Sequence, residues 1–162
     1  MRTLHPGRVM ELDTVLALAR RRGGGLVNVG HGRDPRSTAA AEAFVAAWPG
    51  TVCAVVSWPP EAASWLRQAC RFAGGSPDLW VIADDAASWA GMGRRLVAQP
   101  QWRPGRTIAF SGLADPALPG LVGDIDGLSG AGSDGSSWSF FDGGLRWSGI
   151  HSGVSTVEGR WS

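Results

Sequence analysis

The stretch GLVNVGHGRDPRS at residues 25–37 constrains the fold of this chain more than any other. It opens on a short apolar run that is typical of a buried strand. Gly30 and Gly32 then allow the chain to turn sharply. Asp34 followed by Pro35 is the usual pattern of a helix N-cap and first helical residue. A strand, a glycine turn and a capped helix make the first βα unit of an α/β sheet.

Apolar runs and helical patterns go on alternating along the chain. Strands are expected at residues 51–57, 79–83 and 107–110, and helices at residues 11–22, 35–48, 60–73 and 85–96. The run TVCAVVS is apolar throughout, as in a parallel strand covered on both faces. We therefore predict an α/β fold, a three-layer Rossmann-like sandwich whose mostly parallel sheet has about four strands.

The amino-acid composition changes at Gly123, where glycine and serine become the most frequent residues. Two apolar runs flank Asp142-Gly143-Gly144, which predicts a small C-terminal β-hairpin. We assign residues 1–122 to the Rossmann-like core. Residues 123–162 form a Gly/Ser-rich segment of the same domain, and the tail beyond Ser148 is expected to be disordered.

Composition narrows the classes of partner and compartment. A net charge of +1 over 162 residues argues against nucleic acid, which requires a concentrated basic surface. No apolar run approaches the roughly 20 residues of a membrane span. The sequence as written shows no signal peptide and predicts a cytoplasmic protein, or a periplasmic or extracellular one if the chain is a fragment. Cys53 and Cys70 are expected to be small buried hydrophobic residues.

Most of the nine tryptophans fall at core positions of the expected helices and strands. Trp65 lies in the middle of a helical apolar stripe and is expected to be fully buried. Trp58 instead follows the second strand. We expect it on the rim of the sheet, where its indole could stack on a ligand.

Polar side chains follow each expected strand. Right-handed crossovers bring the carboxyl ends of parallel strands to one rim, where ligands of open α/β sheets bind. The candidate ligand-binding residues are His31, Arg33, Asp34, Ser57, Trp58, Asp84, Asp85 and Ser111. Together they would suit a small polar molecule. The alternative is that Asp34, Asp85 and Ser111 serve only as helix caps.

Motifs for catalysis and cofactors are missing from the sequence. There is no GxSxG nucleophile elbow, and neither cysteine lies in a catalytic signature. The glycines around His31 match neither the dinucleotide fingerprint nor the phosphate loop. A transition-metal site needs two or more convergent ligands, and only His31 is well placed. We therefore predict no catalytic residue, no cofactor and no metal, and favour a binding protein over an enzyme.

Residues 25–147 resemble the second lobe of type 1 periplasmic substrate-binding proteins of ABC transporters, the bacterial branched-chain amino-acid type. The resemblance rests on RDPRSTAAAEAFVAAW, on TVCAVVSW with the helix that follows, on SPDLWVIADD and on IDGLSGAGSDGSSWSFFDGG. It implies that a small polar ligand such as an amino acid binds at the carboxyl ends of the strands. A second lobe supplied in trans, or another protein partner, would then complete the site.

A weaker resemblance links LVNVGHGRDPRS and DPALPGLV to class II chelatases of the sirohydrochlorin and cobalt type. It implies that His31 handles a divalent metal during insertion into a tetrapyrrole. The second histidine of that family has no counterpart, since Ala83-Asp84-Asp85 stands in its place. We favour the binding lobe because it accounts for more of the chain. A protein-interaction module is the third possibility.

Overall fold

The computed structural model describes the backbone of residues 6–149 and the side chains of residues 9–149. Its helices are α1 (Pro6–Arg22), α2 (Pro35–Ala47), α3 (Leu66–Ala73), α4 (Ala86–Val97) and α5 (Leu118–Val122), with short 3₁₀ turns at Pro104–Arg106 and Ser111–Leu113. Its strands are β1 (Leu26–Gly32), β2 (Thr51–Trp58), β3 (Leu79–Ala83), β4 (Thr107–Ala109), β5 (Ser129–Ala131), β6 (Ser137–Phe141) and β7 (Gly144–Ser148).

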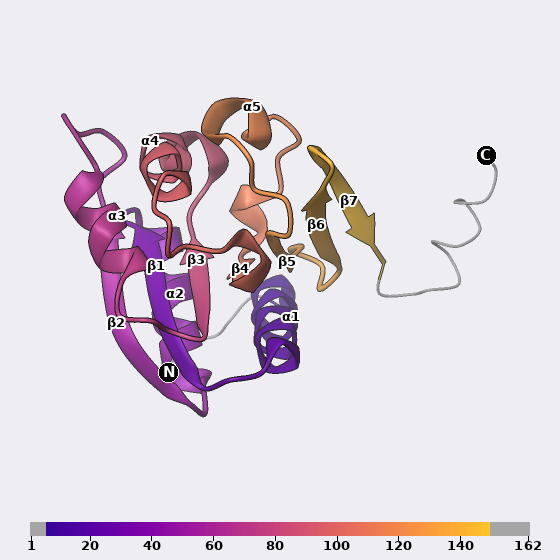
Figure 1. Cartoon of the computed structure of the whole chain (residues 1–162). Helices are drawn as coiled ribbons and strands as arrows, with labels where there is room; N and C mark the ends of the chain where they lie inside the picture. The colour runs from indigo at the N-terminus through magenta and orange to yellow at the C-terminus, as the bar shows by residue number, and fades with distance from the viewer. Residues whose placement is uncertain (1–5, 150–162) are drawn as a thin grey trace, which may run out of the picture.

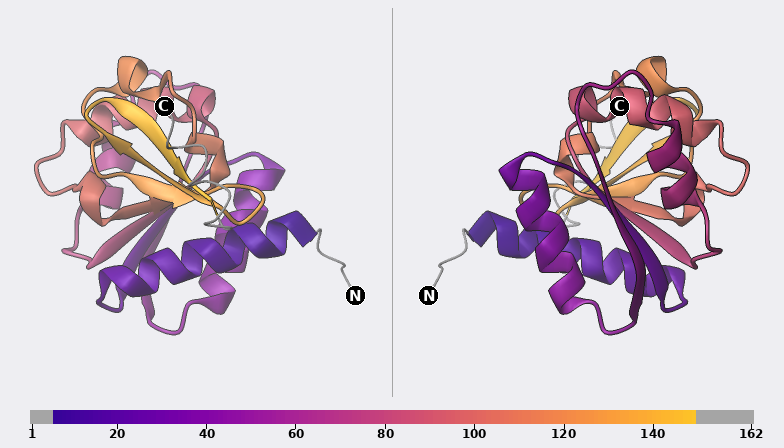
Figure 2. Two further views of the ribbon diagram at one scale, coloured as in Figure 1. Left: turned by 90° about the vertical axis from the view of Figure 1, so that its right-hand side faces the viewer. Right: turned by 90° about the vertical axis from the view of Figure 1, so that its left-hand side faces the viewer.

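The strands form one seven-stranded sheet in the order β2-β1-β3-β4-β5-β6-β7. The pairs from β2 to β5 are parallel, and β6 and β7 add an antiparallel hairpin at one edge. Helices α1 and α2 cover one face, and α3, α4 and α5 cover the other (Figures 1 and 2). Each face has its own apolar core, one around Phe44 and Val81 and the other around Trp89 and Ile82. The predicted α/β sandwich is confirmed.

The sheet has one more parallel strand than the sequence predicted. Strand β5 is only three residues long and contains Gly130, so its composition gives no strand signal. Gly130 is nevertheless needed there, because a Cβ would collide with the carbonyl oxygen of Ala109 and the ring of Trp138. Tertiary packing thus makes a strand from a segment with little strand propensity.

Helix α3 begins at Leu66, six residues later than Pro60, where the sequence placed it. Trp65 is its N-cap residue and is only partly buried, so the expectation of full burial is wrong. Its indole lies against Gly91 of α4, and its Nε1 donates to the carbonyl oxygen of Pro59 (2.8 Å). The chain from the end of β2 to this anchor runs as a loop. The start of helix α1 differs from the prediction in the other direction, because this helix begins earlier in the chain than expected, at Pro6.

Strand β2 is an edge strand rather than one covered on both faces. Its alternate residues Thr51, Cys53 and Val55 are exposed. Cys70, on α3, is exposed as well, so both free cysteines contradict the expected burial. Residue composition could not distinguish an edge strand from a central one, because the order of strands is set by the crossover connections.

The C-terminal hairpin is confirmed, with Asp142 and Gly143 at its turn and both at positive φ. The side chain of Asp126 fixes this turn by accepting from the backbone amides of Asp142 and Gly143 (both 3.0 Å). The expected disordered tail lies outside the described residues from residue 150 onward. In residues 6–149, no helix has the length and hydrophobicity needed to cross a bilayer.

Candidate functional site

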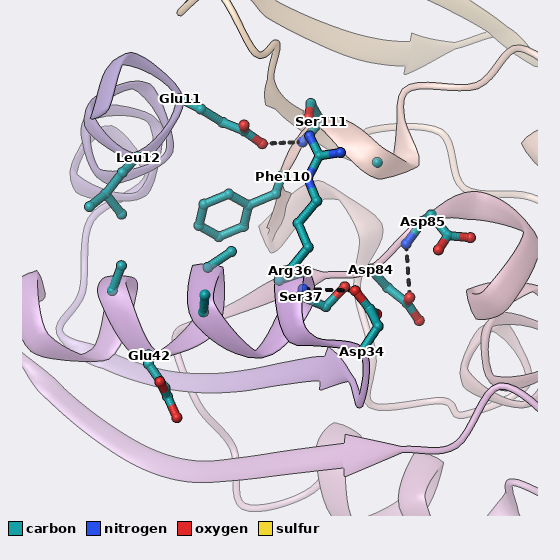
Figure 3. A pocket seen from close by; sticks show the side chains of 15 residues that line it. Glu11, Leu12, Asp34, Arg36, Ser37, Glu42, Asp84, Asp85, Phe110 and Ser111 are labelled. Atoms are coloured by element: carbon teal, nitrogen blue, oxygen red, sulfur yellow. Dashed lines mark hydrogen bonds between the residues drawn. The ribbon is translucent and has the colours of Figure 1, made fainter. Parts of the chain in front are cut away.

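A cavity of about 420 Å³ opens between α1, α2 and the loops that follow β3 and β4. This position is the carboxyl edge of the parallel strands, where the sequence predicted a site. Figure 3 shows side chains from four segments of the chain that line it. The lining comprises Glu11, Leu12, Asp34, Arg36, Ser37, Ala39, Ala40, Glu42, Ala43, Ala83, Asp84, Asp85, Phe110, Ser111 and Gly112.

Asp84 is the most buried acid of this cavity, with 4% of its surface exposed. Its Oδ2 accepts from Trp58 Nε1 (2.7 Å) and its Oδ1 accepts from the backbone amide of Asp85 (2.8 Å). Burial raises the pKa of Asp84 to about 6, because desolvation of the carboxylate outweighs these two hydrogen bonds. The side chain of Asp84 therefore changes charge within the pH range in which most proteins are stable.

Two further carboxylates lie beside Asp84. Asp34 caps α2 by accepting from the amide of Ser37 (3.0 Å), and Asp85 caps α4 by accepting from the amide of Ser88 (2.8 Å). Partial desolvation acts to raise the pKa of Asp34, but the hydrogen bonds from Ser37 lower it overall. Oxygens of Asp34, Asp84 and Asp85 lie within 4.8 Å of one another. The caps expected from the sequence are confirmed for Asp34 and Asp85, and each also lines the cavity. Ser111 is not a cap, because Phe110 holds the N-cap position of the 3₁₀ turn at Ser111–Leu113.

Glu11 closes the cavity from α1, a helix that the sequence did not connect with a site. Its side chain is 8% exposed, and its Oε2 accepts from the amide of Ser111 (2.7 Å), a hydrogen bond that Figure 3 shows. Glu11 precedes the buried Val15 and Ala19 at intervals of four residues. An acid in register with a helical core stripe is a signal that could have indicated a polar function. Apolar side chains of α1 and α2, with Phe110, form the remaining wall.

The two glycines around His31 provide space rather than unusual backbone angles, since neither has a positive φ. A Cβ at Gly30 would lie 2.5 Å from the Trp58 ring, and one at Gly32 would lie 2.5 Å from Asp84 Oδ1. Both glycines thus admit the tryptophan–aspartate pair to this end of the sheet. The sequence placed the motif correctly at the end of a strand, but it predicted that the two glycines allow a sharp turn rather than provide space.

Replacing Gly30 with alanine is expected to lower the free energy of unfolding by about 1–3 kcal/mol, because the added methyl group overpacks a rigid aromatic contact. Chemical denaturation followed by circular dichroism measures the loss. Gly105→Ala is the matched control, since a Cβ there meets nothing within 4 Å. Equal stability of the two variants would contradict this account of the motif.

The structure brings four of the eight predicted residues into the cavity, namely Asp34, Asp84, Asp85 and Ser111. Arg33 instead bonds to Ser57, with Nε donating to Oγ (3.1 Å), and neither side chain lines the cavity. His31 is half-buried, and its Nδ1 donates to the carbonyl oxygen of Gly32 (2.6 Å). His31 is not among the residues that line the cavity.

Trp58 does not lie on the rim as predicted. It is fully buried on the face covered by α3, where its ring packs edge-on against Phe72 with centroids 5.7 Å apart. The reason is the register of β1 and β2, which places Trp58 opposite Gly32 and lets its ring extend over Gly30. From this buried position its indole Nε1 donates a hydrogen bond to Asp84.

No protein-family model and no curated protein matches the chain. Solved structures that resemble it include Rp1789 of Rhodopseudomonas palustris (strain CGA009), with a TM-score of 0.64 and 12% identity over 78% of this chain. Another is an extracellular ligand-binding receptor from Verminephrobacter eiseniae, with a TM-score of 0.58 and 17% identity over 75% of this chain. The match covers 36% of each of these two proteins. The chain therefore shares its fold with about one third of each of these two proteins, in agreement with the expected resemblance at the level of architecture.

Proposed function

We propose that this chain is a ligand-binding domain that holds a small molecule in the cavity between α1, α2 and the ends of β3 and β4. The observation that carries the proposal is the composition of the cavity wall. The lining combines the buried carboxyl groups of Asp84 and Glu11 with apolar surface from Leu12, Ala40 and Phe110. A concave site with a few convergent polar groups on a mainly apolar lining is typical of small-molecule sites.

The fold supports this reading independently of the side chains. Ligands of open α/β sheets bind outside the carboxyl ends of the strands, and the cavity lies at that edge. The similarity to an extracellular ligand-binding receptor supports the same function. Because the chain spans about a third of that protein, we further propose that a second lobe, from another chain, can close over the ligand. We keep an amino acid as the first ligand to test.

The chelatase hypothesis gains nothing from the geometry. His31 does not line the cavity, and its Nδ1 donates a hydrogen bond to a backbone carbonyl oxygen. We therefore propose the ligand-binding function alone.

Filling the cavity tests this proposal. Ala39 lines the cavity on α2, so Ala39→Phe is expected to abolish the binding of any amino acid, amine or carboxylic acid that the wild type binds. Binding is followed by changes in backbone amide NMR shifts, which should cluster at α2 and at residues 110–112. The control is Ala46→Phe, at an exposed position of the same helix outside the cavity. Ligand-induced shifts that persist in Ala39→Phe would place binding elsewhere.

A further inference from the structure

The cavity carries an unusual balance of charge. Five of the side chains that line it are acids, and Arg36 is the single basic one. Arg36 is exposed, as are Asp34, Glu42 and Asp85, whereas Asp84 and Glu11 are each more than nine-tenths buried. The site is therefore negative where water is least able to screen its charges.

The hydrogen-bond partners of these acids do not neutralise them. Asp84 accepts from an indole and an amide, Glu11 accepts from the amide of Ser111, and Asp34 accepts from the amide of Ser37. Every one of these donors is uncharged. Each carboxylate oxygen has more than one acceptor position, so each can accept a further hydrogen bond.

The spacing of the acidic cluster suits a single nitrogen. Oxygens of Asp34, Asp84 and Asp85 lie within 4.8 Å of one another. A point central to three such oxygens is about 2.8 Å from each at most, which is the length of a charge-assisted N–H···O bond. A primary ammonium group has three N–H donors, one for each oxygen.

We propose that the ligand of this cavity is an organic primary amine that carries a net positive charge. Its ammonium group lies among Asp34, Asp84 and Asp85, and its apolar body lies along Leu12, Ala40 and Phe110. This inference rests on the proposed function and adds the ligand's chemical class to it. Above its pKa of about 6, Asp84 is ionised and contributes to the attraction.

Three probes that share one apolar body test the charge preference. They are 2-phenylethylamine, phenylalanine and 3-phenylpropanoate, titrated into the full chain by calorimetry at about pH 7.5, where an alkyl amine is protonated. The amine is expected to bind at least about tenfold more tightly than the other two, because charge-assisted hydrogen bonds to the ammonium are not offset by a carboxylate.

Charge-neutralising variants locate the effect. Glu11→Gln keeps an acceptor for the Ser111 amide, so we expect it to preserve the fold and yet to weaken the binding of the amine measurably. Asp84→Asn is expected to weaken it by about tenfold or more. Asp13→Asn removes the same charge from an exposed position of α1 outside the cavity and is expected to change nothing.

The outcomes separate the two proposals. If phenylalanine or 3-phenylpropanoate binds as well as the amine, and Ala39→Phe abolishes that binding, the inference is overturned while the proposed function stands. Binding of Mg²⁺ at the acidic cluster without any binding of the amine also overturns the inference. If no amine, amino acid or carboxylic acid binds the wild type at millimolar concentration, both proposals fail.

Discussion

Truncating Trp58 to alanine is expected to lower the free energy of unfolding by about 3–5 kcal/mol, the usual cost of removing a fully buried aromatic side chain. The ring contacts Phe72 and fills the space next to Gly30 of β1, so its loss leaves a cavity between this strand and Phe72. The substitution also removes the indole donor from Asp84. Urea-induced unfolding followed by circular dichroism measures the effect.

Trp147→Ala provides the comparison. Trp147 lies on the edge strand β7 with 55% of its surface exposed, and we expect its loss to cost under about 0.5 kcal/mol. Trp58→Phe should fall between the two, because it keeps most of the volume and loses the hydrogen bond. Similar losses for Trp58→Ala and Trp147→Ala would show that Trp58 is not held in the core.

Stability is expected to depend on pH through Asp84. The folded protein retains the Asp84 proton up to about pH 6, whereas the unfolded chain releases it near 3.8. Between these values the folded state binds more protons, so the stabilisation from this group is complete below about pH 4 and is lost as the pH rises through 6. A shift of about two pH units corresponds to about 3 kcal/mol.

Asp84→Asn isolates this contribution from those of the other acids. Asp34 has a lowered pKa and gives a slope of opposite sign, so the wild-type curve alone is a sum of both effects. The variant cannot ionise at residue 84, and the difference in unfolding free energy between wild type and variant should shift by about 3 kcal/mol between pH 4 and 7. Asp13→Asn should run parallel to the wild type. Parallel curves for Asp84→Asn would mean that Asp84 is not desolvated.

The coupling of core and cavity explains why these two effects are the largest. Asp84 belongs to both, since Trp58 holds it from the core and its carboxylate lines the cavity. A carboxyl group in this position costs stability above its pKa. Such a cost is common where a site must present a charge to a ligand.

Much of the site's location could be predicted from local sequence. Strand ends in a parallel α/β sheet meet at one edge, and Asp34, Asp84, Asp85 and Ser111 all follow predicted strands. The position of Glu11 in the buried stripe of α1 indicates a polar role, but its partner could not be predicted, because nothing local indicates that α1 packs against β4 and β5 and brings Glu11 to Ser111. That contact joins residues one hundred positions apart in the sequence.

The sequence by itself determined most of the helices and strands and their order along the chain, because hydrophobic periodicity, caps such as Asp34 and Asp85, and glycine turns act over a few residues. Tertiary structure alone decided which side of the sheet each residue faces and which strand lies at an edge. It buried Trp58, exposed Cys53 and made a strand of residues 129–131. The physical reason is that burial and register depend on neighbours brought together by crossover connections, which short-range patterns do not encode.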